Sequence, residues 1–318
     1  MTYPSSMCSG MLSGKRTFLI IAVVLIALGV SSCQGGLLSR QSSIVVHAGN
    51  QGIVPQFMQN APPARISENA QAPLIVQLEN NGAFGVINGQ YIIGGDSGFL
   101  SIDNADGSFS VEGRSKINPF PGKSLIEKKL RTGELDPQRQ VHDASITATI
   151  CYPYETHAGL NVCIDTDPLN LAQRKKVCSP SVVSGSGGQG GPVAVTEVEP
   201  SMIPEGDAVV PSFVVRIANV GTGLVVDPRK VSLACQPLVQ SKDLFDVVEL
   251  NARLTDTPLS CDSKVKLRDG KAEVECVAVE SFDRALGSYM APLTINLKYG
   301  YTQSISAPVK IERHPGLR

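Results

Sequence analysis

The sequence contains no tryptophan, and aromatic residues make up only 5% of its 318 positions. Charge of either sign is also sparse: 28 Lys and Arg oppose 29 Asp and Glu, which leaves a net charge of −1. No basic stripe or aromatic cluster marks a nucleic-acid surface, so nucleic acid is not expected as a partner. No Asn lies in the Asn-x-Ser/Thr pattern, so N-glycans are not expected either. What remains is rich in Gly, Pro, Val, Thr and Ser, a composition that favours short strands joined by turns.

A charge-free apolar run from Phe18 to Val30 follows the basic pair Lys15-Arg16 and ends in Val30-Ser31-Ser32-Cys33. A basic flank, a short apolar core and small residues after it are typical of a secretory signal. The ending resembles a lipoprotein lipobox, which would make Cys33 the lipid-bearing N-terminus. The alternatives are an uncleaved membrane anchor with a plain thiol at Cys33, and a core helix of a soluble protein. A lipidated Cys33 and an uncleaved anchor would both place the rest of the chain outside the membrane, by the positive-inside rule. We therefore expect a protein held at the outer face of the cytoplasmic membrane.

Cysteine usage agrees with export. Cys8 precedes the apolar run and Cys33 is the lipid candidate, which leaves an even set: Cys151, Cys163, Cys178, Cys235, Cys261 and Cys276. Six cysteines in an exported chain predict three disulfides, with many connectivities open. We expect Cys151–Cys163 across a hairpin whose loop is Tyr152 to Leu160, and Cys261–Cys276 diagonally within another hairpin. Cys178–Cys235 then follows by elimination.

Composition divides the chain into five segments, which are residues 1–36 (signal or anchor), 37–62 (stalk), 63–183 (first domain), 184–192 (Gly/Ser linker) and 193–318 (second domain). Short β-rich runs with regular turn residues fill both domains. The expected fold class is all-β, with two Ig-like β-sandwich domains in tandem.

Three hairpins are predicted from turn residues that tolerate positive φ. Asn88-Gly89 separates two β-rich runs, and Asn104 to Gly107 separates two more. Asp269-Gly270 would set Lys266 opposite Glu273 and Lys264 opposite Glu275, which are favourable cross-strand charge pairs. Further along the second domain, Lys230 to Ala234 is predicted as a strand.

The two domains open alike. Ile75 to Glu79 runs into Asn80-Asn81-Gly82, and Val214 to Ala218 runs into Asn219-Val220-Gly221. This aliphatic strand ending in Asn-x-Gly resembles the N-terminal strand of CARDB-type domains. Together with Ile150 to Tyr154, Val162 to Asp165, Lys176 to Cys178 and Leu293 to Tyr301, it is similar to uncharacterised archaeal membrane-anchored surface proteins. The resemblance implies tandem Ig-like sandwiches on a cell surface and no known catalytic residues.

Several short motifs suggest chemistry without completing it. Gly95-Asp96-Ser97-Gly98 matches the nucleophile tetrapeptide of chymotrypsin-like proteases, but the only earlier histidine, His47, lies in the expected stalk. His142, Asp143 and Ser145 would lie on one strand, where adjacent side chains point to opposite faces. Pro121 to Ser124 lacks the first glycine of a phosphate-binding loop.

Two possible metal sites are also incomplete. Asp103 to Gly107 resembles a calcium loop, but Ala105 and Arg114 stand where oxygen ligands are required. Cys151, His157 and Cys163 could ligate zinc, although export favours disulfides over thiolates. We therefore expect no catalytic residue, cofactor or metal.

The function expected from these observations is non-enzymatic: a surface structural or adhesive protein that contacts a surface protein or a glycan. A ligand-binding or accessory subunit of an envelope transport or secretion complex is the alternative, and an exported enzyme is a third possibility. A deep pocket with convergent polar groups would favour the enzyme.

Overall fold

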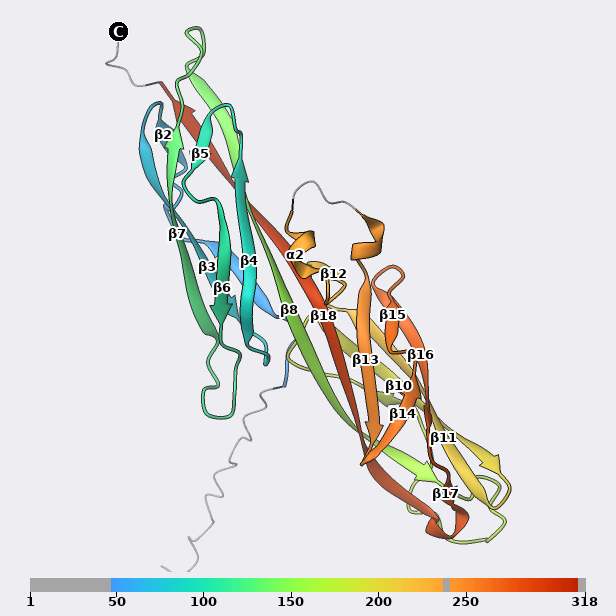
Figure 1. The fold of residues 1–318 in the computed structure, drawn as a ribbon. Helices are drawn as coiled ribbons and strands as arrows, with labels where there is room; N and C mark the ends of the chain where they lie inside the picture. The colour runs from blue at the N-terminus through green and yellow to red at the C-terminus, as the bar shows by residue number, and fades with distance from the viewer. Residues whose placement is uncertain (1–46, 237–240, 314–318) are drawn as a thin grey trace, which may run out of the picture. The chain divides into compact units, whose positions relative to one another are not determined.

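The computed structural model describes residues 47–236 and 241–313, which form a mostly β structure with antiparallel sheets (Figure 1). The expectations for Lys15 to Cys33 lie outside these residues. The first strands are β1 Ile53–Phe57, β2 Arg65–Ser67, β3 Gln71–Asn80, β4 Val86–Gly95, β5 Leu100–Ile102, β6 Asp106–Val111, β7 Gly122–Thr132, β8 Val141–Asp165 and β9 Val183–Ser184. The later elements are β10 Val193–Glu205, β11 Ala208–Asn219, β12 Leu224–Val226, α2 Val231–Ala234, η2 Lys242–Leu244, β13 Val247–Leu254, β14 Thr257–Cys261, β15 Lys264–Lys266, β16 Lys271–Ala278, β17 Phe282–Asp283, η3 Arg284–Leu286 and β18 Ser288–Glu312.

The strands β8 and β18 organise the fold. Each is 25 residues long, and they pair antiparallel over their whole length, from Val141 opposite Glu312 to Asp165 opposite Ser288. In both, buried residues alternate with more exposed ones along most of the strand, which is the period of a strand with one face in a core. A paired strand of this length extends about 80 Å, and in Figure 1 the two cross the fold side by side.

Each end of the β8–β18 pair belongs to a different set of strands. In what we call the first half, β4 and β6 continue the sheet beside residues 146–151 of β8, and a four-stranded sheet runs β1-β3-β7-β5. In the second half, β13 and β15 continue the sheet beside residues 293–298 of β18, and β10, β11, β16 and β14 form the other layer. Buried apolar side chains from both halves belong to one hydrophobic cluster.

The two halves repeat one another in register, which confirms the predicted internal repeat. Ile53 pairs with Asn80 in the first half, and Val193 pairs with Asn219 in the second. Each Asn makes the same local hydrogen bonds: its Oδ1 accepts from the N–H two residues later, and its Nδ2 donates to the carbonyl four residues later. The predicted Asn-x-Gly turn is therefore faithfully repeated in the two halves.

The repeat is broken by one insertion in each half. The second half carries residues 227–246, including α2 and η2, between β12 and β13, where the first half has only a β-bulge near Asn88. The first half carries residues 112–121 between β6 and β7, where the second half has the tight turn around Asp269-Gly270. The predicted strand at Lys230 to Ala234 is wrong, because these residues form α2 and its flank within the insertion.

The three predicted turns have the expected backbone but not the expected partners. Asn88, Asn104 and Asp269 all have positive φ, at 59°, 49° and 50°. However, β4 runs straight through Asn88-Gly89 as a bulge. After the turn at Asn104, β5 pairs with β7 whereas β6 pairs with β4. The three hairpin predictions are wrong because the chain crosses between layers at these turns, or bulges, instead of folding back on itself.

The charge pairs predicted across Asp269-Gly270 are wrong for the same reason. β15 pairs with β13, and β16 pairs with β11 and β14. Glu273 consequently forms an ion pair with Arg216 of β11, at 3.1 Å, and Glu275 accepts a hydrogen bond from Ser212. Only the turn itself remains, with one bridge between Arg268 and Lys271.

One of the three predicted disulfides is confirmed. Cys261–Cys276 forms, although the residues lie directly opposite each other on β14 and β16 and not on a diagonal. Cys151–Cys163 and Cys178–Cys235 are wrong, because the bonds are Cys151–Cys235 and Cys163–Cys178. The predicted hairpin loop at Tyr152 to Leu160 is the middle of β8. Twelve residues along one strand separate Cys151 from Cys163 by about 40 Å, which no disulfide can bridge.

Two segments expected to be extended connectors pack against the fold. Within the expected stalk, β1 pairs with β3 and buries Ile53, so this strand is part of the fold although Gln56 is exposed. Within the expected linker, Gly188 bridges to Gly49, and the buried Gln189 side chain exchanges hydrogen bonds with the backbone of Val195. Both predicted sandwiches fall in one compact unit of the chain. Within the described residues, no helix is long and apolar enough to span a membrane.

Candidate functional site

Four buried tyrosines lie near the middle of the paired strands β8 and β18, where the strands pass from one half to the other. Tyr152 pairs with Tyr301, and Tyr154 pairs with Tyr299. Neighbouring ring centroids lie 5.7–6.4 Å apart. Aromatic rings at these separations, tilted or edge-to-face, pack favourably beyond their area of contact. The cluster therefore fills the junction with rigid side chains.

Every tyrosine hydroxyl in this cluster has a polar partner, and the partners follow the repeat. Tyr154 donates to Asn80 Oδ1 at 3.0 Å, and Tyr301 donates to Asn219 Oδ1 at 3.2 Å. The hydroxyls of Tyr152 and Tyr299 accept from the backbone N–H at the starts of β1 and β10, respectively. Burial raises the pKa of both of these phenols well above the usual value. The hydroxyls therefore hold the strands as neutral groups.

The structure brings the protease-like tetrapeptide close to a histidine, but not in catalytic order. His142 Nε2 lies 2.7 Å from Asp96 Oδ2, and His142 Nδ1 lies 2.8 Å from a guanidinium nitrogen of Arg139. Because guanidinium nitrogens only donate, Nδ1 accepts and the proton is on Nε2, facing Asp96. The hydrogen bond from His142 lowers the pKa of Asp96. Both ring nitrogens are thus occupied, and His142 has no nitrogen left to act as a base toward Ser97.

The other sequence candidates are also not assembled into a reactive site. Asp143 forms an ion pair with Lys310 at 3.3 Å, on the opposite face of β8 from His142. Cys151 and Cys163 are in disulfides, which removes both thiolates from the zinc hypothesis that included His157. In the part of the chain that the structure describes, no group of three or more His, Cys, Asp or Glu is placed to hold a metal ion.

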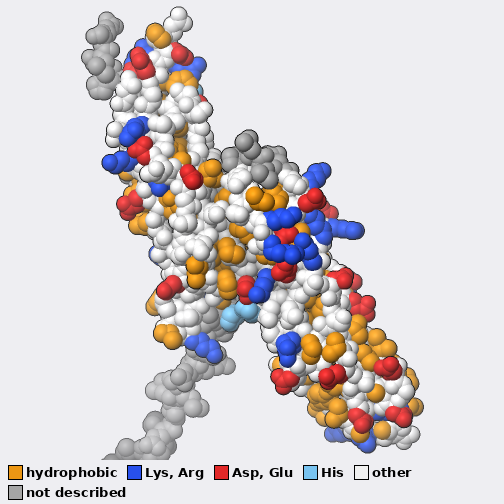
Figure 2. Space-filling model, in the orientation of Figure 1, with side chains coloured by type: hydrophobic (Ala, Val, Ile, Leu, Met, Phe, Trp, Pro, Cys, Tyr) orange, Lys and Arg blue, Asp and Glu red, His pale blue; other side chains and the backbone are white. Residues whose placement is uncertain are grey.

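A charged hollow of about 630 Å³ lies on the outward face of β13 and β18. Figure 2 shows basic and acidic side chains gathered in this region. Charged, amide and hydroxyl groups line it, contributed by Arg229, Glu249, Asn251, Ser263, Lys264, Asn296 and Lys298. A mixed-sign, hydrogen-bonding surface of this kind suits a polar partner, such as a glycan or a charged protein surface.

Asp227 anchors one side of this charged hollow. It is 1% exposed, and its carboxylate receives hydrogen bonds from Lys264 Nζ at 2.8 Å and from the backbone N–H of Arg229 at 3.1 Å. Burial by itself would raise the pKa of this carboxyl, but these bonds outweigh it and the pKa is lowered. Arg229 extends the network to Glu249, at 3.1 Å. The basic groups are therefore held in place by buried and half-buried carboxylates.

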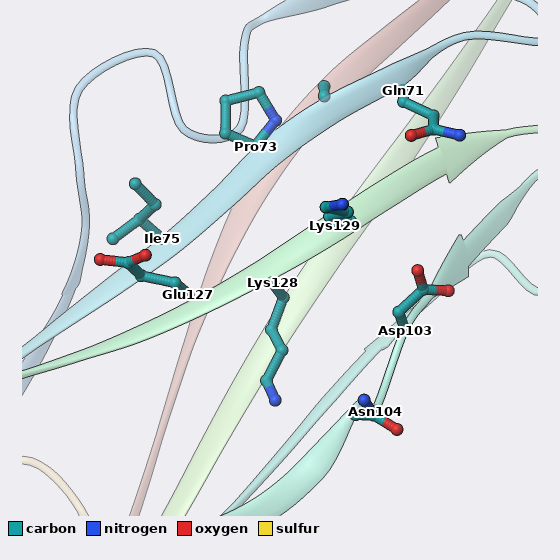
Figure 3. Close-up of a pocket in the computed structure, with 9 residues that line it drawn as sticks. Gln71, Pro73, Ile75, Asp103, Asn104, Glu127, Lys128 and Lys129 are labelled. Atoms are coloured by element: carbon teal, nitrogen blue, oxygen red, sulfur yellow. The ribbon is translucent and has the colours of Figure 1, made fainter.

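A second hollow, of about 690 Å³, lies on the first half (Figure 3). Pro73 and Ile75 stand on β3, Glu127 and Lys129 on β7, and the turn after β5 closes one side. The turn contains Asp103 and Asn104, the start of the calcium-like motif. Asp103 is paired with Arg131 at 2.8 Å, so its charge is already matched.

A third hollow, of about 480 Å³, brings His47 and His157 together with the expected linker. Their ring centroids are 6.1 Å apart. Burial, His157 and Lys116 all lower the pKa of His47. His157 Nδ1 lies 2.6 Å from Asn296 Oδ1 and its other nitrogen lies 3.6 Å from Glu155. His157 of β8 therefore contacts Asn296 of β18, which also lines the charged hollow.

Sequence reasoning missed the tyrosine cluster and the charged hollow. The sequence did contain a signal for the tyrosine cluster. Tyr152 and Tyr154 continue the apolar alternation of β8, and Tyr299 and Tyr301 continue that of β18. The charged hollow had no comparable sequence signal, because its residues are far apart in the sequence and come from the insertion, β13, β15 and β18.

The chain matches no family model, and no curated protein sequence is similar to it.

Proposed function

We propose that the protein is a non-enzymatic structural or adhesive protein of the cell surface, anchored at the outer face of the cytoplasmic membrane by its N-terminal segment. The observation that carries this proposal is the shared strand pair. β8 and β18 pass between the halves without a loop, and buried tyrosines fill the crossing. A junction of this kind transmits force and orientation without a hinge. Three disulfides suit an oxidising compartment.

Each half is taken to be an Ig-like sandwich. The order β1-β3-β7-β5 in one layer and β6-β4-β8-β18 in the other resembles the two layers of such a domain, with the last strand supplied by the opposite half. The second half follows the same scheme, with β8 as the supplied strand. One departure from the variable-type order is that β5 precedes the edge strand β6 in the chain.

The charged hollow is the candidate contact surface for a surface protein or glycan. Its basic side chains are more than 40% exposed and are oriented by carboxylates, so they can exchange a water contact for a partner contact at little entropic cost. Electrostatic matching of this type mainly governs the rate and selectivity of encounter.

The experiment compares attachment of intact cells to surfaces coated with the envelope proteins or glycans of the same cells. Cells with the wild-type protein, cells without it, and cells with Lys298→Glu are compared. Lys271→Glu is the matched control, since Lys271 is exposed on β16 and outside the hollow. We expect attachment to fall several-fold without the protein and with Lys298→Glu, and to be retained with Lys271→Glu.

Protease added outside the same cells gives the second readout. External cleavage of the protein with unchanged attachment in all strains would reject the adhesive role and favour an accessory subunit of an envelope transport or secretion complex. Protection of the protein in intact cells, with cleavage only after lysis, would reject the surface address itself.

A further inference from the structure

The loop 112–121 makes the first half longer than the second between otherwise equivalent strands. β6 and β7 flank it, while β15 and β16 are joined by the tight turn at Asp269-Gly270. In repeated structures, an insertion in one copy maps to a loop that often carries binding. Because the tight turn suffices to connect these strands, the extra residues are not required by the fold.

This loop presents large apolar side chains to solvent. Ile117 is 97% exposed and Phe120 is 74% exposed. Two hydrogen bonds between Ser115 and Asn118 hold the turn that carries them. The backbone N–H of Ser115 donates to the Asn118 carbonyl at 2.7 Å, and the Ser115 hydroxyl accepts from the Asn118 N–H at 2.9 Å. Two large apolar groups held on one turn leave apolar surface in water, which contact with a partner or a bilayer would cover.

The loop lies against the point where the described chain begins. Arg114 donates from its guanidinium to the Ala48 carbonyl at 2.6 Å, and its backbone N–H donates to the Gly82 carbonyl at 2.9 Å. The expected signal or anchor segment ends at Gly36, and the ten residues between there and His47 can span at most about 35 Å. Gly49 also bridges to Gly188, so the chain enters the fold between this loop and the junction of the halves. If the N-terminal segment is held at a membrane, this loop lies within a short tether of it.

Basic residues lie on both sides of the apolar pair in the sequence. In the sequence, Arg114 and Lys116 precede it and Lys123 follows it. Lys123 is paired with Glu79 at 3.1 Å, which leaves Arg114 and Lys116 as the basic groups and Glu112 as the acidic one. Apolar side chains beside Lys and Arg are typical of surfaces that enter the headgroup region of anionic bilayers. Lysine and arginine stems also bury alongside apolar groups while their charges stay hydrated.

We propose that residues 113–121 dip into the headgroup region of an anionic lipid bilayer, with Ile117 and Phe120 as the inserting side chains. The inference rests on the proposed anchoring of the N-terminal segment. It goes further by assigning a second membrane contact, which would fix the orientation of the folded unit on the surface.

The absence of tryptophan from the sequence permits a direct test. Full-length Phe120→Trp protein is reconstituted into vesicles of phosphatidylglycerol and phosphatidylcholine with brominated acyl chains. Leu286→Trp is the matched control, because Leu286 is also an exposed apolar residue but lies in the second half. We expect the indole emission of the Phe120→Trp protein to shift to shorter wavelength and to lose at least half its intensity to the bromines, while the control emission does neither. Adding Ile117→Asp to Phe120→Trp should reduce the quenching.

Flotation of the same vesicles separates the possible failures. Phe120→Trp protein that floats with vesicles but shows water-like, unquenched indole emission overturns the loop contact and leaves the anchor intact; the loop would then be left for a protein partner. Protein that does not float overturns both. Equal quenching in the Leu286→Trp control would mean non-specific adsorption, which also rejects the assignment to this loop.

Discussion

At the scale of single residues, the tyrosine hydroxyls and the glycines beside them define the junction. Gly82 and Gly221 occupy equivalent turns, and a Cβ at either would meet a tyrosine hydroxyl, at 1.9 Å from Tyr154 and 2.4 Å from Tyr301. No φ constraint is needed to explain these glycines. They are required by the close approach of the Asn-x-Gly turns to the aromatic cluster.

We therefore expect Gly82→Ala and Gly221→Ala each to lower the free energy of unfolding by about 1–3 kcal/mol, the usual cost of overpacking. Gly94→Ala is the control, since a Cβ there would have no atom within 4 Å; its effect should stay below about 0.5 kcal/mol. Urea unfolding followed by circular dichroism gives the comparison. Equal effects at Gly82 and Gly94 would contradict the packing described for the junction.

Residue identity predicted local backbone conformation well. Asn88, Asn104, Asp269 and Gly270 all adopt the positive φ expected of them. This preference is a local property of short polar side chains and glycine, so the sequence contains it directly. The choice of which strands pair with each other is not a local property. The same turn can close a hairpin or carry the chain to the opposite layer, and that choice depends on core packing of distant segments.

At the scale of elements, the two 25-residue strands were predictable in part. From Ala144 to Ile164 every second residue is buried except Leu160, which is half-buried, so the sequence does indicate one strand there. The prediction failed because Tyr152 to Leu160 contains Pro153 and Gly159, which are typical of turns. In the structure Pro153 lies opposite Gly300, at the centre of the pair, and both are accommodated within the ladder.

The wrong disulfides follow from that one error. Once residues 146–165 are one strand, Cys151 and Cys163 must find partners elsewhere. Cys151 then bonds Cys235 and fastens the insertion 227–246 to the outer face of β8, while Cys163 bonds Cys178 just after the strand. Cys261–Cys276 was predicted from a hairpin that does not form; the bond forms because β14 and β16 are neighbouring strands of one layer.

The Cys151–Cys235 bond should control the insertion specifically. We expect Cys151→Ser with Cys235→Ser to lower the free energy of unfolding by about 2–4 kcal/mol and to speed limited proteolysis within residues 227–246. The matched variant, Cys163→Ser with Cys178→Ser, removes a bond of shorter sequence separation and should leave cleavage in that insertion unchanged. Mass spectrometry of the fragments locates the cuts. Equal cleavage of the insertion in both variants would refute the specific role of Cys151–Cys235.

At the scale of the whole molecule, the prediction of β class needed only composition and turn spacing, and the internal repeat was visible in eight residues of each copy. The relation between the halves was not visible. The predicted architecture has two domains on a flexible linker, whereas in the structure the two halves exchange their last strands. Both architectures contain the same short strands and the same Asn-x-Gly turns. They differ only in whether each long strand bends back near its middle, which no short-range pattern decides.

This difference has a thermodynamic consequence. Each half takes a strand from the other, so unfolding one half removes a strand from the second, and both should unfold in a single transition. Val76 and Val215 are a matched pair for the test, being equivalent in the repeat and fully buried in opposite halves. We expect Val76→Ala and Val215→Ala each to lower the same calorimetric transition by several degrees, because about 2 kcal/mol of core packing is lost in either case. The double variant should still show one transition, shifted further. Two resolved transitions, with each substitution shifting only one of them, would show that the halves are independent domains and that the continuous strands do not couple them.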